Sequence, residues 1–377
     1  MTEKKRVTIG LLLPSSTIMP MGKDFEKGVK KGLNKLEGYS DWDVDIVPEF
    51  IGQGGKEKIL EAISKLLTYD DADIITGVIS NKSVAEVAER FEKTKKPLLV
   101  NNLGEHLPDI SRYNKNIFIN STNLWQQIWS LGNWGVKQFG KKGMIVSGLY
   151  DAGYSFAAML QAGMLAADTE AVMPFAVAPV QVPGELADIK SVFQYIDQFD
   201  PDFVFAAFCG EEATLFLDEY IKRGLHKSKP LLGLPYLLQS FSEKDTIEIY
   251  TTISTQVKLE GDSLVSAAEG AFNPFPMLGY EAGLIIADAL NEGGKKVLQD
   301  QLQGSGSIST RGHLNINPSL LGDNTHVYLV KNGFDGDLET STRIVMEELP
   351  TVKVNDDNVQ QLIHEFSTGW FNPYMGV

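Results

Sequence analysis

The sequence predicts an α/β protein of two lobes, each built on a parallel β-sheet with helices on both faces. Short apolar runs of strand length alternate with segments whose apolar residues recur every three or four positions, as in amphipathic helices. This alternation begins at residue 7 and begins again after Asn120, so the pattern occurs twice in 377 residues. That length predicts two or three domains, and a hydrophobic content of 43% is enough for their cores.

The first half of the chain alternates strand and helix. Residues 7–13 form a continuous apolar run ended by Pro14, which is typical of a buried parallel strand. The apolar face of the following helix carries Phe25, Val29, Leu33 and Leu36. Further strands are expected at 44–51, 73–79 and 97–100, and further helices at 59–67 and 83–93. Because parallel strands require crossovers, we expect these helices to cover both faces of one sheet.

The second half repeats the pattern and then departs from it. Expected strands lie at 143–147, 203–208 and 230–234, and expected helices at 125–140, 155–167, 189–196 and 212–223. Residues 171–180 are expected to be extended, with interruptions at Pro174 and Pro179. Beyond Thr251 we expect a strand at 252–258, helices at 280–290 and 294–303, and a strand at 327–330 with a turn at Asn332 and Gly333. The aromatic segment 370–374 near the end of the chain is expected to pack back onto the body.

Charge and hydropathy exclude two classes of partner. The chain has 34 Lys and Arg against 49 Asp and Glu, a net charge of −15 that would repel nucleic acid. No apolar run reaches the 18 residues or so of a membrane span. Residues 1–13 lack the long apolar core and cleavage site of a signal peptide. We therefore expect either a cytoplasmic protein or an exported chain whose signal segment has been removed.

Catalytic and metal-binding patterns are weak. The single cysteine, Cys209, excludes an internal disulfide and a zinc site of several thiolates. Residues 135–142 approach a phosphate-binding loop, but they follow a helix and precede a strand, the reverse of the required order. The five histidines are scattered along the chain. Acidic neighbours would raise the pKa of Cys209 and leave it inert. We expect no cofactor, no metal and no enzymatic activity.

Polar side chains gather where the expected strands end, which is where open α/β sheets bind ligands. In the first lobe, hydroxyl and amide groups stand at helix N-termini, where free N–H groups suit a carboxylate or carbonyl. In the second lobe, aromatic and acidic side chains follow the strands. Capping of each helix, or bracing of each loop, is the alternative role for these residues. The candidate ligand-binding residues are Ser15, Ser16, Ile79, Ser80, Asn81, Asn101 and Asn102 in the first lobe, and Tyr150, Asp151, Cys209, Gly210, Glu211 and Tyr236 in the second.

The ordered set of these features resembles the type I periplasmic ligand-binding proteins, in the branch that contains the leucine/isoleucine/valine-binding proteins of ABC importers. The resemblance runs from residue 7 to about 335. The matching segments are residues 9–14, 77–80, 150–154 (Tyr150-Asp151-Ala152-Gly153-Tyr154), 200–204, 210–213, 279–283 (Gly279-Tyr280-Glu281-Ala282-Gly283), 287–290 and 310–317.

The resemblance implies two Rossmann-like lobes joined by three crossover strands, near 120–122, 250–256 and 328–331. One lobe would contain 1–121 and 254–329, and the other 122–253 and 330–377. Such a protein is a monomer outside the cytoplasm, periplasmic or lipid-anchored. It closes by hinge motion on a small solute, such as an amino acid, in the cleft between the lobes and delivers it to the importer's permease subunits. Ser80, Asn101 and Asn102 would take the acidic end of the ligand, opposite Tyr150, Glu211 and Tyr236.

Two departures from that family widen the range of ligands. Asn101 and Asn102 stand where amino-acid binders usually place a hydroxyl, and residues 235–238 are apolar where an acidic partner for an ammonium group is expected. An amide, or an aromatic or aliphatic carboxylate, therefore fits as well as an amino acid. The alternative function is a cytoplasmic ligand-sensing regulator of the same fold, similar to the amide-sensing repressor of amidase operons. An enzyme that uses Cys209 or the acidic pair Asp151 and Glu211 is the third hypothesis.

Overall fold

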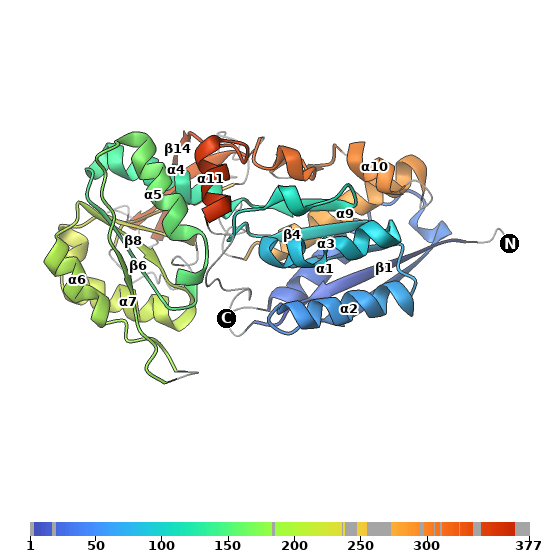
Figure 1. The fold of residues 1–377 in the computed structure, drawn as a ribbon, viewed down its shortest axis with the longest axis horizontal. Helices are drawn as coiled ribbons and strands as arrows, with labels where there is room; N and C mark the ends of the chain where they lie inside the picture. The colour runs from blue at the N-terminus through green and yellow to red at the C-terminus, as the bar shows by residue number, and fades with distance from the viewer. Residues whose placement is uncertain are drawn as a thin grey trace. The chain divides into compact units, whose positions relative to one another are not determined.

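The protein, a computed structural model, forms two compact units (Figure 1). Unit 1 contains residues 1–124, 273–324 and 373–377, and unit 2 contains residues 125–272 and 325–372. The hinge between the lobes, predicted at the crossovers near 120–122, 250–256 and 328–331, stays a prediction. The structure describes residues 4–16, 20–182, 185–235, 237, 247–254, 273–294, 298–304, 306–309, 311–323, 325–334 and 341–365.

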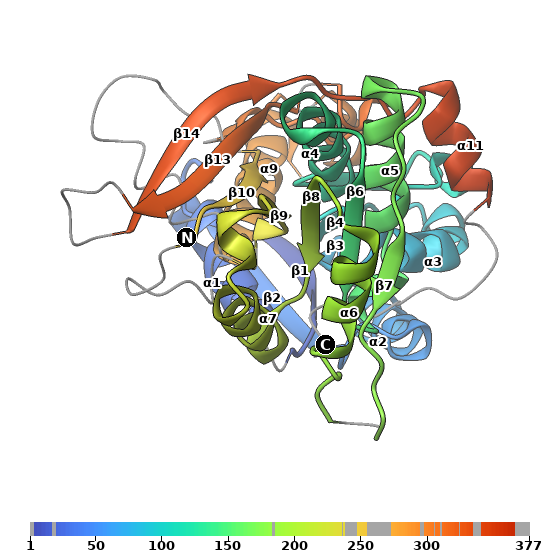
Figure 2. The same cartoon turned by 90° about the vertical axis from the view of Figure 1, so that its left-hand side faces the viewer.

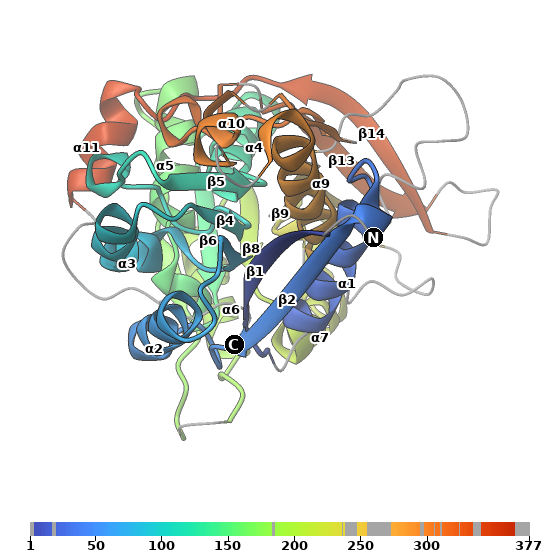
Figure 3. The same cartoon turned by 90° about the vertical axis from the view of Figure 1, so that its right-hand side faces the viewer.

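The sheet of unit 1 has five strands, all parallel, in the order β2-β1-β3-β4-β5 (Figure 3). The strand β1, which lies between β2 and β3, is buried from Val7 onward because helices cover both of its faces. The fifth strand was predicted only at its end, as the crossover strand near 120–122, since the expected restart of the pattern at Asn120 falls inside it. The strands are β1 (Lys5–Leu13), β2 (Trp42–Phe50), β3 (Ile74–Val78), β4 (Leu98–Asn102) and β5 (Ile117–Ser121).

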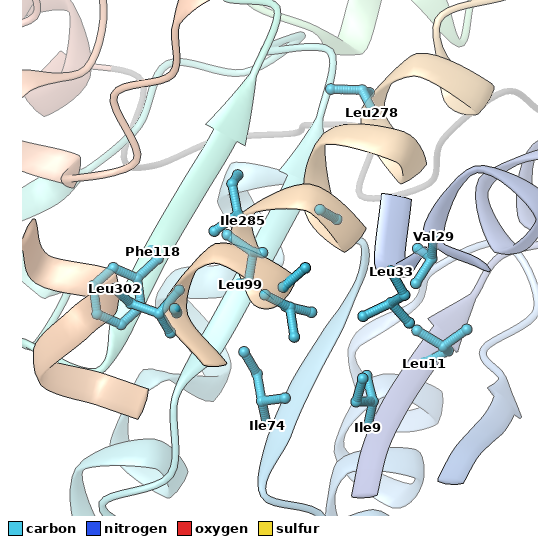
Figure 4. Close-up of a cluster of buried hydrophobic side chains, with 14 of the residues drawn as sticks. Ile9, Leu11, Val29, Leu33, Ile74, Leu99, Phe118, Leu278, Ile285 and Leu302 are labelled. Carbon is cyan, nitrogen blue, oxygen red and sulfur yellow. The ribbon is translucent and has the colours of Figure 1, made fainter. Parts of the chain in front are cut away.

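Helices cover the two faces of this sheet in separate apolar cores. The helices are α1 (Met21–Leu33), α9 (Phe275–Gly293) and α10 (Leu298–Gly304) on one face, and α2 (Lys56–Thr68) and α3 (Asn81–Thr94) on the other. Figure 4 shows Val29 and Leu33 of α1 meeting Ile9 and Leu11 of β1, with α9 alongside. Leu36, expected on the first helix, lies beyond its end but is buried in the same core.

Four glycines let α1 and α9 approach each other backbone to backbone. A Cβ added at Gly28 would lie 2.3 Å from the carbonyl oxygen of Pro276, and one at Gly32 would lie 2.2 Å from that of Tyr280. In the other direction, Gly279 and Gly283 face the backbone of α1 at 2.1 and 2.3 Å. This glycine seam joins two segments of unit 1 that are about 250 positions apart in the chain.

The sheet of unit 2 has the order β14-β13-β10-β9-β8-β6-β7 (Figure 2). The strands from β10 to β7 are parallel, whereas β13 runs antiparallel to β10 and β14 antiparallel to β13. The strands are β6 (Gly143–Ser147), β7 (Phe175–Val177), β8 (Phe203–Ala207), β9 (Leu231–Gly233), β10 (Ile249–Ile253), β13 (Val327–Phe334) and β14 (Ser341–Leu349).

Helices also cover both faces of this second sheet. The helices α6 (Ser191–Phe199) and α7 (Gly210–Lys222) pack on one face. On the other face, α4 (Leu124–Phe139) packs against Phe203 and Leu232, and α5 (Phe156–Ala167) packs against β6 through Met164. A last helix, α11 (Asp357–Glu365), follows β14.

One expectation for the second half was wrong. The turn expected at Asn332 and Gly333 is absent, because β13 continues through both residues and pairs with β14. The extended segment 171–180 is interrupted as expected at Pro174 and Pro179, which cannot donate to a ladder, and it contains the short edge strand β7 and an isolated bridge between Val172 and Lys142. The chain after 335 does pack back, through β14, while the aromatic segment 370–374 lies outside the described residues.

Small elements complete the described chain. A two-stranded antiparallel pair, β11 (Ile308–Ser309) and β12 (Gly312–His313), follows α10 in unit 1. Among the described residues, no helix is long and apolar enough to cross a membrane. The short 3₁₀ helices are η1 (Tyr39–Asp41), η2 (Ile110–Arg112), η3 (Asp151–Gly153), η4 (Leu225–Lys227) and η8 (Pro318–Leu320).

Candidate functional site

The strand order of each unit locates a candidate binding edge. In unit 1, β2 lies on one side of β1 and the later strands lie on the other, so the topology reverses between β1 and β3. Ligands of open α/β sheets bind beyond the carboxyl ends of the strands at such a point. Ser15 and Ser16 follow β1, and Ser80 and Asn81 follow β3. Ser15 is exposed, and its N–H donates to the carbonyl of Gly52 at 2.7 Å.

Ser80 and Asn81 are held by the protein itself. Ser80 caps the N-terminus of α3, because its hydroxyl accepts the N–H of Ser83 at 3.3 Å. The side-chain N–H of Asn81 donates to the carbonyl of His106 at 2.8 Å. Both side chains are 2% exposed. Ser80 therefore already caps α3, and Asn81 already binds the backbone at His106. Contact of either residue with a ligand stays a prediction.

Asn101 and Asn102 lie on opposite faces of β4, since successive residues of a strand alternate. The amide of Asn101 donates to the hydroxyl of Thr76 at 2.9 Å and accepts from the amide of Asn120 at 3.0 Å. The amide of Asn102 donates to the carbonyl of Ile79 at 3.2 Å and accepts from the N–H of Gly104 at 3.0 Å. Both are fully buried. Each amide also makes a second donation, Asn101 to the carbonyl of Leu99 at 3.2 Å and Asn102 to the side-chain oxygen of Asn81 at 2.8 Å. A hydroxyl has one donor and could not make both donations, which gives a structural reason for two asparagines here.

A buried ion pair between α9 and the β11–β12 turn adjoins this edge, and the sequence did not reveal it. Nε of Arg311 donates to Oε1 of Glu281 at 3.0 Å and Nη2 donates to Oε2 at 2.6 Å. The side chain of Glu281 is completely buried and that of Arg311 is 9% exposed. The same guanidinium donates to the side-chain oxygen of Asn120 at 2.5 Å and to the carbonyl of Ser121 at 2.6 Å. Arg311 thus binds the carboxyl end of β5.

A second buried acid of unit 1 lies on the loop after β4. The carboxylate of Glu105 is 4% exposed, and burial raises its pKa to about 7. The backbone amides of residues 103–105 oppose part of this rise, but neither carboxylate oxygen completes a hydrogen bond with a described residue. Sequence reasoning missed Glu105, because nothing in a loop sequence indicates which carboxylate the fold buries.

In unit 2 the topology reverses between β6 and β8, which places two candidate loops side by side. Tyr150 and Asp151 follow β6, and Cys209, Gly210 and Glu211 follow β8 at the start of α7. Tyr150 is 40% exposed and Asp151 only 8%. Gly210 adopts φ +56°, a left-handed conformation that favours glycine. Tyr236 lies outside the described residues.

The side chains of Asp151, Cys209 and Glu212 meet at this point. The thiol of Cys209 lies 3.7 and 3.9 Å from the carboxylate oxygens of Asp151. A Cβ added at Gly148 would lie 2.4 Å from Oε2 of Glu212 and 3.6 Å from Oδ2 of Asp151, so both carboxylates approach the same glycine. Burial, and to a lesser extent Glu212, raises the pKa of Asp151 to about 7.

The same surroundings determine the chemistry of the cysteine. Burial first, and then Asp151 and Glu212, raises the pKa of the Cys209 thiol. The expected direction of that shift is confirmed, although Asp151 rather than Glu211 is the closest acid. Glu211 is exposed, whereas Glu212 turns inward and accepts the N–H of Ala187 at 2.9 Å. Within the described residues, no group of three His, Cys, Asp or Glu side chains could hold a metal ion.

Comparison with known proteins agrees with this architecture. The family model described as periplasmic binding protein matches residues 6–302, so the chain belongs to that family. No curated protein sequence matches the chain. The two-lobe α/β fold with mainly parallel sheets is that of the type I periplasmic binding proteins, as predicted.

Three solved structures illustrate the likeness in fold. An ABC transporter substrate-binding protein from Sphaerobacter thermophilus is 20% identical, with 92% of this chain and 98% of that chain covered and a TM-score of 0.70. A solute-binding protein of an R. palustris ABC transporter, in complex with benzoate, is 20% identical, with coverage of 94% and 99% and a TM-score of 0.67. The branched-chain amino acid binder LivJ from Streptococcus pneumoniae, in complex with isoleucine, is 15% identical, with coverage of 93% and 100% and a TM-score of 0.64.

Proposed function

We propose that this protein is the extracytoplasmic solute-binding component of an ABC importer, which captures a small organic ligand by hinge closure of its two lobes. The observation that carries the proposal is the coincidence of polar loops with the point of topological reversal in both sheets. The solute-binding proteins of similar fold support it. The proposed partners are the permease subunits of the importer, and the proposed state is a monomer with no catalytic activity.

The proposed ligand is a small molecule with a carboxylate, carbonyl or amide group on an apolar body. The N-terminal end of α3 presents backbone N–H groups at the binding edge of unit 1, which favours an anionic or carbonyl oxygen. In unit 2 the exposed ring of Tyr150 offers an apolar surface. Benzoate and isoleucine, which structures of similar fold hold, both have this character. The proposed contacts are the candidate residues named above in the two units.

A ligand screen tests this proposal. Thermal midpoints are measured with benzoate, 4-hydroxybenzoate, isoleucine, leucine and acetamide. A ligand at 100 times its dissociation constant stabilises the folded protein by about 2.7 kcal/mol, which shifts the midpoint visibly. Failure of every compound to shift it would remove the support for a solute binder of this kind.

Tyr150→Ala tests the proposed contact in unit 2. We expect it to weaken binding of the strongest compound about tenfold or more, because the ring would lose its apolar contact with the ligand. Tyr195→Ala is the matched control, since Tyr195 is an equally exposed tyrosine of unit 2, 47% exposed against 40%, on α6. Equal affinities of the two variants would contradict the assignment of Tyr150.

The cytoplasmic regulator of the same fold stays the alternative. The two functions differ in where the chain resides, so fractionation of the producing cells separates them. A protein recovered with the extracytoplasmic fraction supports the importer, and one recovered only with the cytoplasm supports the regulator.

A further inference from the structure

We propose that Arg311 is a positioning residue for ligand capture, which holds the ends of β4 and β5 and the segment through which the chain leaves unit 1. The proposal rests on the proposed function, because it assigns Arg311 to the same binding edge. Arg311 itself is not proposed to touch the ligand.

The first step is the anchorage of Arg311. Glu281 lies in the interior of α9 and holds the guanidinium through two hydrogen bonds. The hydroxyl of Ser309 donates to the same carboxylate at 2.7 Å and accepts the backbone N–H of Arg311 at 3.0 Å. Because α9 is packed backbone to backbone against α1 along the glycine seam, the acceptor of Arg311 belongs to a closely packed helix. The guanidinium is therefore fixed in both position and orientation.

Hydrogen bonds connect Arg311 to the binding edge of unit 1. The guanidinium binds Asn120 and Ser121 at the end of β5, as described above. The amide of Asn120 in turn donates to the side-chain oxygen of Asn101 at the end of β4, and the amide of Asn101 donates to the hydroxyl of Thr76 in β3. One chain of hydrogen bonds thus connects α9 with the ends of β5 and β4 and with the middle of β3, in the order in which the three strands lie in the sheet.

The chain leaves unit 1 after Leu124, along a segment that is bound to the loop after β4. The hydroxyl of Thr122 and the N–H of Leu124 both donate to the carbonyl of Leu103, at 2.8 and 2.7 Å. Gly104 packs so closely on this segment that an added Cβ would lie 2.8 Å from the Cα of Asn123. Hydrogen bonds and close packing therefore join the loop after β4 to the segment 121–124, through which the chain leaves unit 1. Arg311 holds the first residue of that segment, because it donates to the carbonyl of Ser121.

Arginine is required for this arrangement because its planar fork donates in several fixed directions at once. Nε and Nη2 reach Glu281, Nη1 reaches Ser121, and Nη2 also reaches Asn120. A lysine keeps the charge opposite Glu281 but cannot hold the carboxylate and both groups of β5 in the same geometry. Arg311→Lys therefore separates positioning from simple charge neutralisation.

The test compares wild type with Arg311→Lys and Glu281→Gln, and takes Arg112→Lys as control. Arg112 is a half-exposed arginine of unit 1 that pairs with Glu86 at 3.6 Å. Two quantities are measured at a temperature where all four proteins are folded. One is hydrogen–deuterium exchange by peptide, and the other is the dissociation constant for whichever of benzoate, 4-hydroxybenzoate and isoleucine binds the wild type most tightly.

We expect both core variants to exchange at least tenfold faster in peptides covering 98–104 and 117–124, with β1 and α2 unchanged, and to bind the probe at least tenfold more weakly. The control should match the wild type in both measurements. Exchange that rises equally throughout unit 1, or affinity within twofold of wild type, would overturn the positioning role. If the wild type binds none of these three probes, nor leucine or acetamide, the proposed function fails, while the exchange pattern still decides whether Arg311 holds these strand ends.

Discussion

The glycine seam between α1 and α9 makes a sharp prediction for Gly32→Ala. The added Cβ would stand 2.2 Å from the carbonyl oxygen of Tyr280, 2.7 Å from the amide nitrogen of Leu284 and 2.9 Å from the carbonyl carbon of Gly283. All three atoms belong to the backbone of α9, so no side chain can rotate away. The two helices must separate by about 0.8 Å to bring the shortest contact from 2.2 Å to 3.0 Å.

The magnitude follows from two opposing effects. Alanine in a helix interior gains about 1 kcal/mol over glycine through helix propensity. Overpacking of a well-packed core costs about 1–3 kcal/mol and sometimes more, and a gap of 0.5–1 Å forfeits a quarter to a half of the dispersion attraction between the separated surfaces. Because the clash is between two backbones, we place its cost at or above the top of that range. The expected net loss is about 2 kcal/mol.

Differential scanning calorimetry measures this loss. For a unit of this size, about 2 kcal/mol lowers the thermal midpoint by about 4–8 °C. Gly304→Ala is the matched control, since Gly304 also lies in a helix, at the end of α10, with open space where its Cβ would stand. The control should leave the midpoint unchanged or raise it slightly. A Gly32→Ala protein that melts with the wild type would refute the close approach of the two helices.

Two further predictions concern the binding edges. Ser80→Ala removes the N-cap of α3 and should lower the free energy of unfolding, measured by urea denaturation, by about 1 kcal/mol. Ser80→Asp can still cap the helix and should lower it little, so equal losses in the two variants would contradict the capping role. Asp151 has a folded pKa of about 7 against an ordinary 3.8, so the unfolded chain releases this proton at lower pH and stability falls as pH rises through that interval. Asp151→Asn cannot ionise and should lose less stability than wild type between pH 4 and pH 8, and parallel pH profiles would show that the acid is not buried.

Much of the local structure was predictable because it depends on neighbouring residues. The apolar run 7–13 predicted β1, and the amphipathic spacing of Phe25, Val29 and Leu33 predicted α1. The strand-end loops were predictable for the same reason, since a strand followed by a helix implies a turn at one edge of the sheet. What these loops do was less accessible. Asn101 stays a predicted ligand contact, and only the structure shows that its amide is bound to Thr76 and Asn120.

The sequence alone determined the fold class and the alternation of strands and helices, because both follow from local patterns. Only the tertiary structure decided the glycine seam, the Arg311–Glu281 pair and the addition of β14 to β13. The seam and the ion pair join segments distant in the chain, and the strand pairing depends on which edge of the sheet is free. Close packing and a buried ion pair each require two segments to meet, and the sequence around either segment does not indicate which segment it will meet.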